Sequence, residues 1–286
     1  VDEQGVSRYS ADQITGMFIS LMFAGHHTTS GTAAWTLIEL LRHTETLARV
    51  NDELDTLFSS GGEVSYHALR EIPLLEASIT EALRLHPPLI LLMRRVTEEF
   101  DYGGFRVPVG WNAAVSPAVS NRMASSFPDP DRFDIERHLG ANPQSRRIFS
   151  YLSFGGGRHR CVGAAFALMQ LKAIFSVLLR EFEFELAQPS DHYRNDETRM
   201  VVQIEQPCRV RYRRREVRTP TVEPAPAAPA AEAGAARLSV DRDLCQGHGV
   251  CVSECPELFS LDPDELKVVL KSEVVPEELR ERAERA

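Results

Sequence analysis

The sequence lacks an excess of basic residues and has no long apolar run. Lys and Arg number 32 against 41 Asp and Glu, so the formal charge is -9 at pH 7. A nucleic-acid-binding surface needs a positive field, and this charge balance therefore argues against nucleic acid as a partner. The longest apolar stretch, residues 14–25, falls short of the roughly 20 residues that cross a bilayer. We predict a buried core helix there and no transmembrane segment.

The chain also lacks an initiator Met, a secretory leader and evenly spaced cysteines. Cys161 and Cys208 stand alone, whereas Cys245, Cys251 and Cys255 fall within a span of eleven residues. Crowded cysteines without a secretory signal bind metal more often than they form disulfides, which favours a reducing cytoplasm. Both ends interrupt helix-like or charged segments, so we interpret the chain as a fragment truncated at both ends.

Residues 1–216 are predicted to form a mostly helical domain with a strand-rich middle. Helices are indicated by apolar periodicity between capping and breaking residues, and strands by short apolar stretches between turn residues. The predicted elements are helices over 10–42 with Ser10 as N-cap, 45–57, 73–85 and 162–181, short strands over 89–115, and loops over 121–144.

Residues 217–237 differ in composition from what precedes them. Pro and Ala dominate and apolar core formers disappear, as expected of a semi-rigid interdomain linker. Residues 238–286 then contain twelve Asp and Glu against six Lys and Arg, so this segment carries -6 of the total charge of -9. An acidic domain on a linker suits docking onto a basic surface, although a merely soluble surface would have the same composition.

The strongest local signal is Phe-Gly-Gly-Gly-Arg-His-Arg-Cys-Val-Gly at residues 154–163. The glycines permit a tight backbone path, and Cys161 then lies at the start of a predicted helix. The partial positive charge of a helix N-terminus favours a thiolate, which is a good axial ligand for haem iron. A buried structural cysteine and a catalytic nucleophile are the alternatives. The Gly-Lys-Ser/Thr ending of a phosphate loop is missing, as is the Cys-x-x-Cys-His motif of covalent haem attachment.

Two further motifs lie upstream. Glu81 and Arg84 are three residues apart on one helix face, a spacing that alone most often marks a surface ion pair of little worth. Residues 24–29 read Ala-Gly-His-His-Thr-Thr. Adjacent His26 and His27 point about 100° apart on a helix, so they cannot chelate one metal as an i, i+4 pair could. Alone, this pair would be a polar break in a core helix.

In this order and spacing, the three motifs resemble those of the cytochrome P-450 family. Residues 154–163 resemble its haem-binding signature, and residues 24–29 its oxygen-activating segment, with His27 where an acid usually stands. Residues 25–28, 85–90 and 193–196 are similar to the sterol 14-alpha-demethylase branch. The resemblance covers about residues 10–215. It implies the C-terminal part of the P-450 fold, which is mainly α with small β-sheets.

The resemblance implies haem b as cofactor, with Cys161 ligating its iron. Phe154 and Gly157 belong to the same signature. His159 and Arg94 are the candidates for the haem propionates, which charge-assisted hydrogen bonds would anchor. For Arg94 an ordinary surface position is the alternative, and the neighbouring Arg95 leaves the choice between the two open.

The resemblance also implies two catalytic and three structural roles. Thr28 would hydrogen-bond dioxygen at the haem, and His27 would relay protons from solvent. Glu81 and Arg84 would join Arg137 to lock the fold behind the haem. In this branch the 14-alpha methyl group of a sterol is oxidised in three successive monooxygenations and leaves as formate. A monooxygenase of another apolar substrate, or an inactive haem-binding or electron-carrier fragment, is the alternative.

The tail carries C-x2-H-x2-C-x3-C-P at residues 245–256, which resembles the bacterial ferredoxin run with His248 in place of the second Cys. Similar single-cluster ferredoxins imply Cys245 and Cys251 as ligands of a 3Fe–4S centre, more than a 4Fe–4S one. Their third ligand would lie beyond this chain, so an incomplete α+β ferredoxin-like domain is expected over 238–286. We do not expect Cys255 to bind the same cluster, and His248 is more a polar neighbour than a ligand. A zinc site is the rival.

Together the two resemblances imply a fused oxygenation and electron-transfer protein of the bacterial cytoplasm. An NAD(P)H-dependent ferredoxin reductase would reduce the tethered cluster, which would pass electrons to the haem. The linker would make this weak redox encounter intramolecular.

Overall fold

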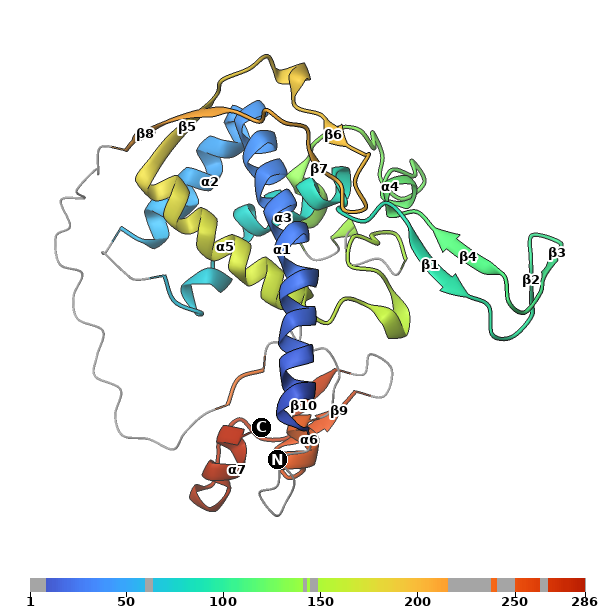
Figure 1. Ribbon diagram of the computed structural model, residues 1–286. Coiled ribbons are helices and arrows are strands. Elements are labelled where there is room, and N and C mark those ends of the chain that lie inside the picture. The colour runs from blue at the N-terminus through green and yellow to red at the C-terminus, as the bar shows by residue number, and fades with distance from the viewer. Residues whose placement is uncertain are drawn as a thin grey trace. The chain divides into compact units, whose positions relative to one another are not determined.

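The computed structural model describes residues 9–59, 64–140, 143–144, 149–215, 238–240, 250–262 and 267–285. The chain forms two compact units, Val1–Thr221 and Val222–Ala286, and each is described by itself (Figure 1). The predicted linker over 217–237 lies outside the described residues, as do Cys245 and His248.

The long helix α1 (Ala11–Arg42) begins at a capping box. The Ser10 hydroxyl accepts a hydrogen bond from the Gln13 amide at 3.2 Å, and the Gln13 side chain accepts one from the Ser10 amide at 2.9 Å. Two of the N–H groups that a helix start leaves unpaired are thereby satisfied. The predicted N-cap at Ser10 is confirmed.

Four helices enclose the core of the first unit: α1, α2 (Thr44–Leu57), α3 (Pro73–Leu85) and α5 (Ala164–Glu181). Helices α3 and α5 each bury an apolar side chain at every fourth position, which places these side chains on one face. Each such side chain, when fully buried, contributes roughly 1.5–3 kcal/mol to the stability of the fold. The buried members are Leu40, Val50, Leu54, Leu75, Ile79, Leu83, Leu171, Phe175 and Leu179.

The prediction that residues 14–25 form a buried helix is wrong as to burial. They are helical, but Phe18 and Phe23 are 64% and 76% exposed, and the buried positions of α1 begin at Gly31. Figure 1 shows this half of α1 extending beyond the other helices of its unit. The apolar composition of a helix shows that its surface is suited to burial. It does not show whether another segment of the chain packs over that surface. Among the described residues, no helix combines the length and the apolarity that a bilayer span requires.

The strands form small antiparallel pairs, as predicted for residues 89–115. A tight turn at Gly103 and Gly104, with φ of +58° and +81°, closes one hairpin, and glycine adopts such angles without strain. The pairs are β1 (Leu92–Arg95) with β4 (Asn112–Val115), β2 (Phe100–Tyr102) with β3 (Phe105–Val107), β5 (Phe182–Leu186) with β8 (Val210–Arg214), and β6 (Asn195–Asp196) with β7 (Gln203–Ile204).

Single turns of helix fill the connections between these elements. They are η1 (Ala68–Arg70), α4 (Pro117–Ser120), η2 (Ile135–His138), η4 (Gly157–His159) and η5 (Ser190–His192). Two of them matter for the site. Helix α4 ends at the buried Asn121, and η4 lies within the glycine-rich loop before α5.

The second unit is a small α+β body. It contains α6 (Val250–Glu254), the antiparallel pair β9 (Phe259–Leu261) and β10 (Val268–Leu270), η6 (Glu277–Leu279) and α7 (Arg280–Arg285). Its core consists of the buried residues Cys255, Leu258, Phe259, Val268 and Val275. Together the two units have the predicted fold class, mainly α with small sheets followed by a small α+β domain.

Candidate functional site

The loop of residues 152–161 holds Cys161 by a series of backbone hydrogen bonds. The Gly155 amide donates to Leu152 O at 2.8 Å, and the Cys161 amide donates to Phe154 O at 2.8 Å. Gly155 and Gly157 have φ of +72° and +64°, a region where a side chain would be strained. Phe154 packs against the helical core. The loop is therefore a closed turn anchored at one end in the core.

Cys161 is exposed and lies three residues before the first residue of α5. The Ala164 amide contacts the Cys161 carbonyl at 3.4 Å, and Gly163 is the N-cap of the helix. A Cβ on Gly163 would lie 3.9 Å from Cys161 Sγ, an ordinary van der Waals distance, so the helix start passes close beside the sulfur.

The residues around Cys161 fit a haem. Val162 and Phe166 are 83% and 67% exposed, which gives an apolar surface next to an accessible sulfur. Helix α5 also contacts α1, whose exposed half is rich in Met, Phe, Ile and Leu. A porphyrin needs one axial donor and apolar surface on its faces, and both are present. Cys161 is the residue that would bind the iron.

The two candidates for the propionates are both exposed. Arg94 lies on β1, opposite Ala113 of β4, and its Nη1 donates to Met93 O at 2.8 Å. His159 ends η4, in the loop that carries Cys161. Both side chains are accessible to an anionic group. Arg95, the next residue of β1, is also exposed, so the choice between the two arginines stays open.

Thr28 and His27 lie near the middle of α1. The Thr28 hydroxyl donates to Ala24 O at 2.7 Å, which leaves its oxygen free to accept a hydrogen bond. Nδ1 of His27 lies 3.2 Å from Nε2 of Gln203 on β7. The rings of His26 and His27 meet edge to face, with centroids 4.8 Å apart. Gln203 had no sequence signal, because its partner lies 176 positions away.

The hairpin that carries Gln203 approaches α1 closely at a glycine. A Cβ on Gly31 would lie 3.4 Å from Val202 O and 3.8 Å from Gln203 Cγ. The Val202 amide donates to Pro88 O at 2.8 Å, which attaches β7 to the segment after α3. Gly31 lies one turn beyond His27, so the Gln203 side chain spans one turn of the helix.

Glu81, Arg84 and Arg137 come together in the interior. Nε and Nη2 of Arg84 donate to the two oxygens of Glu81 at 2.7 and 2.9 Å. Arg137 Nε lies 3.5 Å from Glu81 Oε1, an ion-pair contact longer than a hydrogen bond. His138, which the motifs did not indicate, is a fourth member: its Nε2 lies 2.7 Å from Glu81 Oε2. The position after Arg137 carried no motif that would have marked it.

The pKa of Glu81 is lowered by its partners. Burial alone would raise the pKa of this carboxyl, but hydrogen bonds from Arg84 and His138, together with the charges of both, outweigh burial. Glu81 is therefore a carboxylate in the folded protein.

Arg84 uses all of its donors. Besides the two bonds to Glu81, Nη1 donates to Asn121 O and Pro130 O at 2.9 and 2.6 Å, and Nη2 donates to Arg132 O at 3.1 Å. A guanidinium has five N–H groups, and each has an acceptor here. Arg84 thus attaches the connection after α4 to helix α3.

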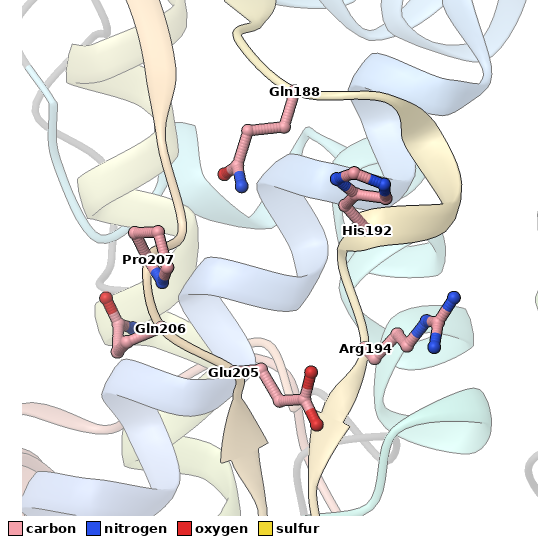
Figure 2. A pocket seen from close by; sticks show the side chains of 6 residues that line it. All are labelled: Gln188, His192, Arg194, Glu205, Gln206 and Pro207. Carbon is pink, nitrogen blue, oxygen red and sulfur yellow. The ribbon is translucent and has the colours of Figure 1, made fainter.

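An open polar depression of about 320 Å³ lies elsewhere on the first unit. Figure 2 shows its lining: Gln188, His192, Arg194, Glu205, Gln206 and Pro207. None of the residues predicted for the site belongs to this lining. We take the Cys161 loop as the candidate functional site, because it holds an accessible sulfur beside exposed apolar side chains.

In the second unit, Cys251 lies on α6 and is half-buried, while Cys255 is wholly buried in the apolar core. Across the part of the chain that the structure describes, no three His, Cys, Asp or Glu side chains come together as a metal site. Cys245 and His248 are outside the described residues. The predicted ligand pair of Cys245 and Cys251 therefore stays a prediction.

A helical unit with an exposed cysteine at a glycine-rich helix start is the arrangement expected of the haem-thiolate class of proteins. Residues 1–212 match the Cytochrome P-450 family, and the chain belongs to that family. Residues 238–286 match the 4Fe-4S single cluster domain.

Curated relatives of the chain carry sterol demethylase names. The chain is 58% identical over 217 residues to the sterol 14alpha-demethylase of Mycolicibacterium vanbaalenii, covering 75% of this chain and 48% of that protein. It is 59% identical over 216 residues to the sterol 14alpha-demethylase of Mycobacterium tuberculosis H37Rv, with coverages of 74% and 48%. It is 41% identical over 213 residues to the sterol 14-demethylase of Arabidopsis thaliana, with coverages of 72% and 43%.

Among solved structures, the haem domain of cytochrome P450DA superposes with a TM-score of 0.69 at 27% identity, covering 77% of this chain and 48% of that chain. The chain therefore spans about half the length of the proteins that it resembles.

Proposed function

We propose that this chain is part of a haem-thiolate monooxygenase that removes the 14-alpha methyl group of a sterol. The observation that carries the proposal is the Cys161 loop, in which an exposed sulfur lies at the start of α5 behind a closed glycine turn. The relatives named above support the sterol as substrate. The chain spans about half the length of these relatives, so the substrate and the activity of the whole protein are part of this proposal.

Bound haem b would supply the reductive activation of dioxygen, and the protein would supply its ligand and its protons. Cys161 would ligate the iron, Phe154 and Gly157 would shape the ligand loop, and His159 and Arg94 would bind the propionates. Thr28 would hydrogen-bond dioxygen, and its bond to Ala24 O leaves its oxygen free to accept a further hydrogen bond.

Protons would reach Thr28 through its neighbour His27, which is exposed to solvent. Glu81, Arg84 and Arg137 hold the fold behind the loop. These roles are proposals that rest on the positions described above.

We further propose that the second unit passes electrons to the haem from an NAD(P)H-dependent ferredoxin reductase. Its match to a single-cluster domain supports an iron–sulfur centre. We propose a 3Fe–4S centre with Cys245 and Cys251 among its ligands, because His248 replaces one cysteine of the ferredoxin run. Electron paramagnetic resonance of the oxidised protein tests this, since an oxidised 3Fe–4S centre is paramagnetic and an oxidised 4Fe–4S centre of the ferredoxin type is not.

We propose domain boundaries at 1–216, 217–237 and 238–286, and a location in the bacterial cytoplasm. The crowded cysteines of residues 245–255 support a reducing compartment. The charge of -9 supports a protein without a nucleic-acid partner.

The first test is the carbon-monoxide difference spectrum of the dithionite-reduced protein. We expect a strongly red-shifted Soret band that Cys161→Ala abolishes, while the control Cys208→Ala keeps it. Cys208 is half-buried beside β8 and has no place in the proposed haem site. A band at the position of histidine-ligated haem, or no haem at all, would refute the haem-thiolate assignment.

The substrate is tested separately. With reductase and NAD(P)H present, the whole protein should convert a 14-alpha-methylated sterol and release one formate per demethylated product. An otherwise identical sterol without the 14-alpha methyl group is the matched control and should yield no formate. Binding and oxidation of other apolar compounds in the absence of sterol turnover would refute the sterol assignment and leave the monooxygenase class intact.

A further inference from the structure

The buried Asn121 joins the ion cluster at Glu81 to the loop that carries Cys161. Asn121 is the C-terminal cap of α4 and is 0% exposed. Its backbone carbonyl accepts a hydrogen bond from Arg84 Nη1 at 2.9 Å. This bond ties the backbone of Asn121 to the guanidinium that also binds Glu81.

The side chain of Asn121 binds the start of the loop, at Leu152 and Ser153. Oδ1 accepts a hydrogen bond from the Leu152 amide at 2.8 Å. Nδ2 donates to the Ser153 hydroxyl at 2.9 Å and to Arg84 O at 3.3 Å. Because a backbone N–H can only donate, the bond from Leu152 determines which side-chain atom is oxygen and which is nitrogen.

From Leu152 the hydrogen bonds continue to the cysteine. Leu152 O accepts from the Gly155 amide, and Phe154 O accepts from the Cys161 amide, both at 2.8 Å. Ser153 adds a second anchor, since its hydroxyl donates to Leu83 O on α3 at 2.9 Å. The loop that carries the sulfur is thus tied to α3 through two neighbouring residues, and one of the two ties passes through Asn121.

We propose that Asn121 is a positioning residue for the haem ligand, through which the Glu81–Arg84 pair holds the Cys161 loop in place. The inference rests on the proposed haem-thiolate function and adds a residue that the motifs did not contain. Removing the Asn121 amide leaves the buried Leu152 N–H without an acceptor, and the loop must move to find one. The sulfur at the far end of the loop would then lose its fixed position.

The experiment compares thiolate ligation in the reduced carbon-monoxide complex of four proteins: wild type, Asn121→Ala, Asn121→Asp and Ser78→Ala. Ser78 is a matched control, because it is a buried polar residue of α3 whose hydroxyl donates to Leu74 O, away from the loop. The red-shifted Soret band is followed with time, and thermal unfolding is recorded for each protein.

We expect Asn121→Ala to lose the red-shifted band roughly tenfold faster than wild type, the effect typical of removing a partner that orients a metal ligand. Asn121→Asp keeps an acceptor for the Leu152 amide and loses both donors, so its loss should be slower than that of Asn121→Ala. Ser78→Ala should lose the band at the wild-type rate, even where it lowers the melting temperature.

If both Asn121 variants keep the band as long as wild type, the positioning role is refuted. The same holds if Ser78→Ala loses it as fast as they do at equal melting temperature, because the residue would then be only structural. If Asn121→Ala does not fold, the comparison of Asn121→Asp with Ser78→Ala decides in the same way. A wild-type protein without the band would instead overturn the haem-thiolate function itself, and the inference with it.

Discussion

At the scale of single residues, the charge state of Glu81 has a consequence for acid stability. The pKa of this carboxyl is lower in the folded protein than in the unfolded chain. A lowered pKa contributes stability that is fully present above the ordinary carboxyl value and is lost as the pH falls through the folded value. We expect the contribution of Glu81 to the free energy of unfolding to stay level from neutral pH down to about 5 and to fall below the ordinary value of 4.5.

Urea unfolding of the apoprotein at a series of pH values measures this. The matched variant is Glu81→Gln, which lacks the titrating group. Breaking a buried ion pair costs about 3–5 kcal/mol, so the variant should be less stable at neutral pH. It should also lose less stability on acidification than wild type. If wild type and Glu81→Gln lose the same free energy of unfolding on acidification, Glu81 does not govern the acid stability of the protein.

A second residue-scale prediction concerns Gln203, which contacts His27 across α1 and β7. If His27 relays protons as proposed, Gln203→Met removes the group that orients the ring and should lower kcat roughly tenfold with little change in KM. The bond is exposed, so thermal stability should not change. Glu205→Gln, an exposed position two residues further on, is the control. Unchanged kcat in Gln203→Met would contradict the orienting role.

The motifs that the sequence shows are local, whereas their partners in the structure come from distant parts of the chain. Glu81 with Arg84 was recognisable because three-residue spacing makes a helical pair. The contacts of His138, Asn121 and Gln203 with these motifs cross 37 to 176 positions of chain, and nothing in local spacing predicts them.

At the scale of elements, helix α5 supplies both the core and the start of the site. Phe175 is 1% exposed at its centre, whereas Phe166 on the first turns is 67% exposed. We expect Phe175→Ala to lower the free energy of unfolding by about 3–5 kcal/mol, through lost burial and the cavity left behind. Phe166→Ala on the same helix should change it little in the apoprotein. Equal losses from the two variants, measured by urea unfolding, would show that the core does not lie where it is described.

Helix ends were predictable where a cap or a proline marks them. Ser10 starts α1, and Pro73 starts α3 within its first turn, as expected. The pair of β5 and β8 was not anticipated. Phe182, Phe184 and Leu186 alternate with two glutamates, but the strand follows directly on α5 without a breaker. Its partner lies 24 to 32 positions away, and only the folded chain brings the two together.

At the scale of the whole molecule, the proposed linker makes a kinetic prediction. A tether raises the effective concentration of the second unit near the first. Turnover per molecule should therefore be independent of protein concentration. After proteolytic cleavage within 217–237 it should fall on dilution, while the carbon-monoxide spectrum stays the same. Concentration-independent turnover after complete cleavage would show that electrons reach the haem by another route.

The composition of the chain predicts a helical domain, a linker and an acidic tail, because each has a distinct residue usage. It did not predict that half of α1 is exposed. Burial depends on which other segments lie nearby, and an apolar helix has the same composition whether it is covered or not.

Arg84 shows how little freedom a sequence has at such a position. Its five N–H groups meet five acceptors in a fixed planar fork, and the acceptors come from Glu81, Asn121, Pro130 and Arg132. Lysine has three donors on one nitrogen, and every other side chain has fewer. No second amino acid can therefore supply all five hydrogen bonds. Any substitution of Arg84, lysine included, leaves buried oxygen atoms of the protein without a donor, so arginine is the one residue that position 84 can accept.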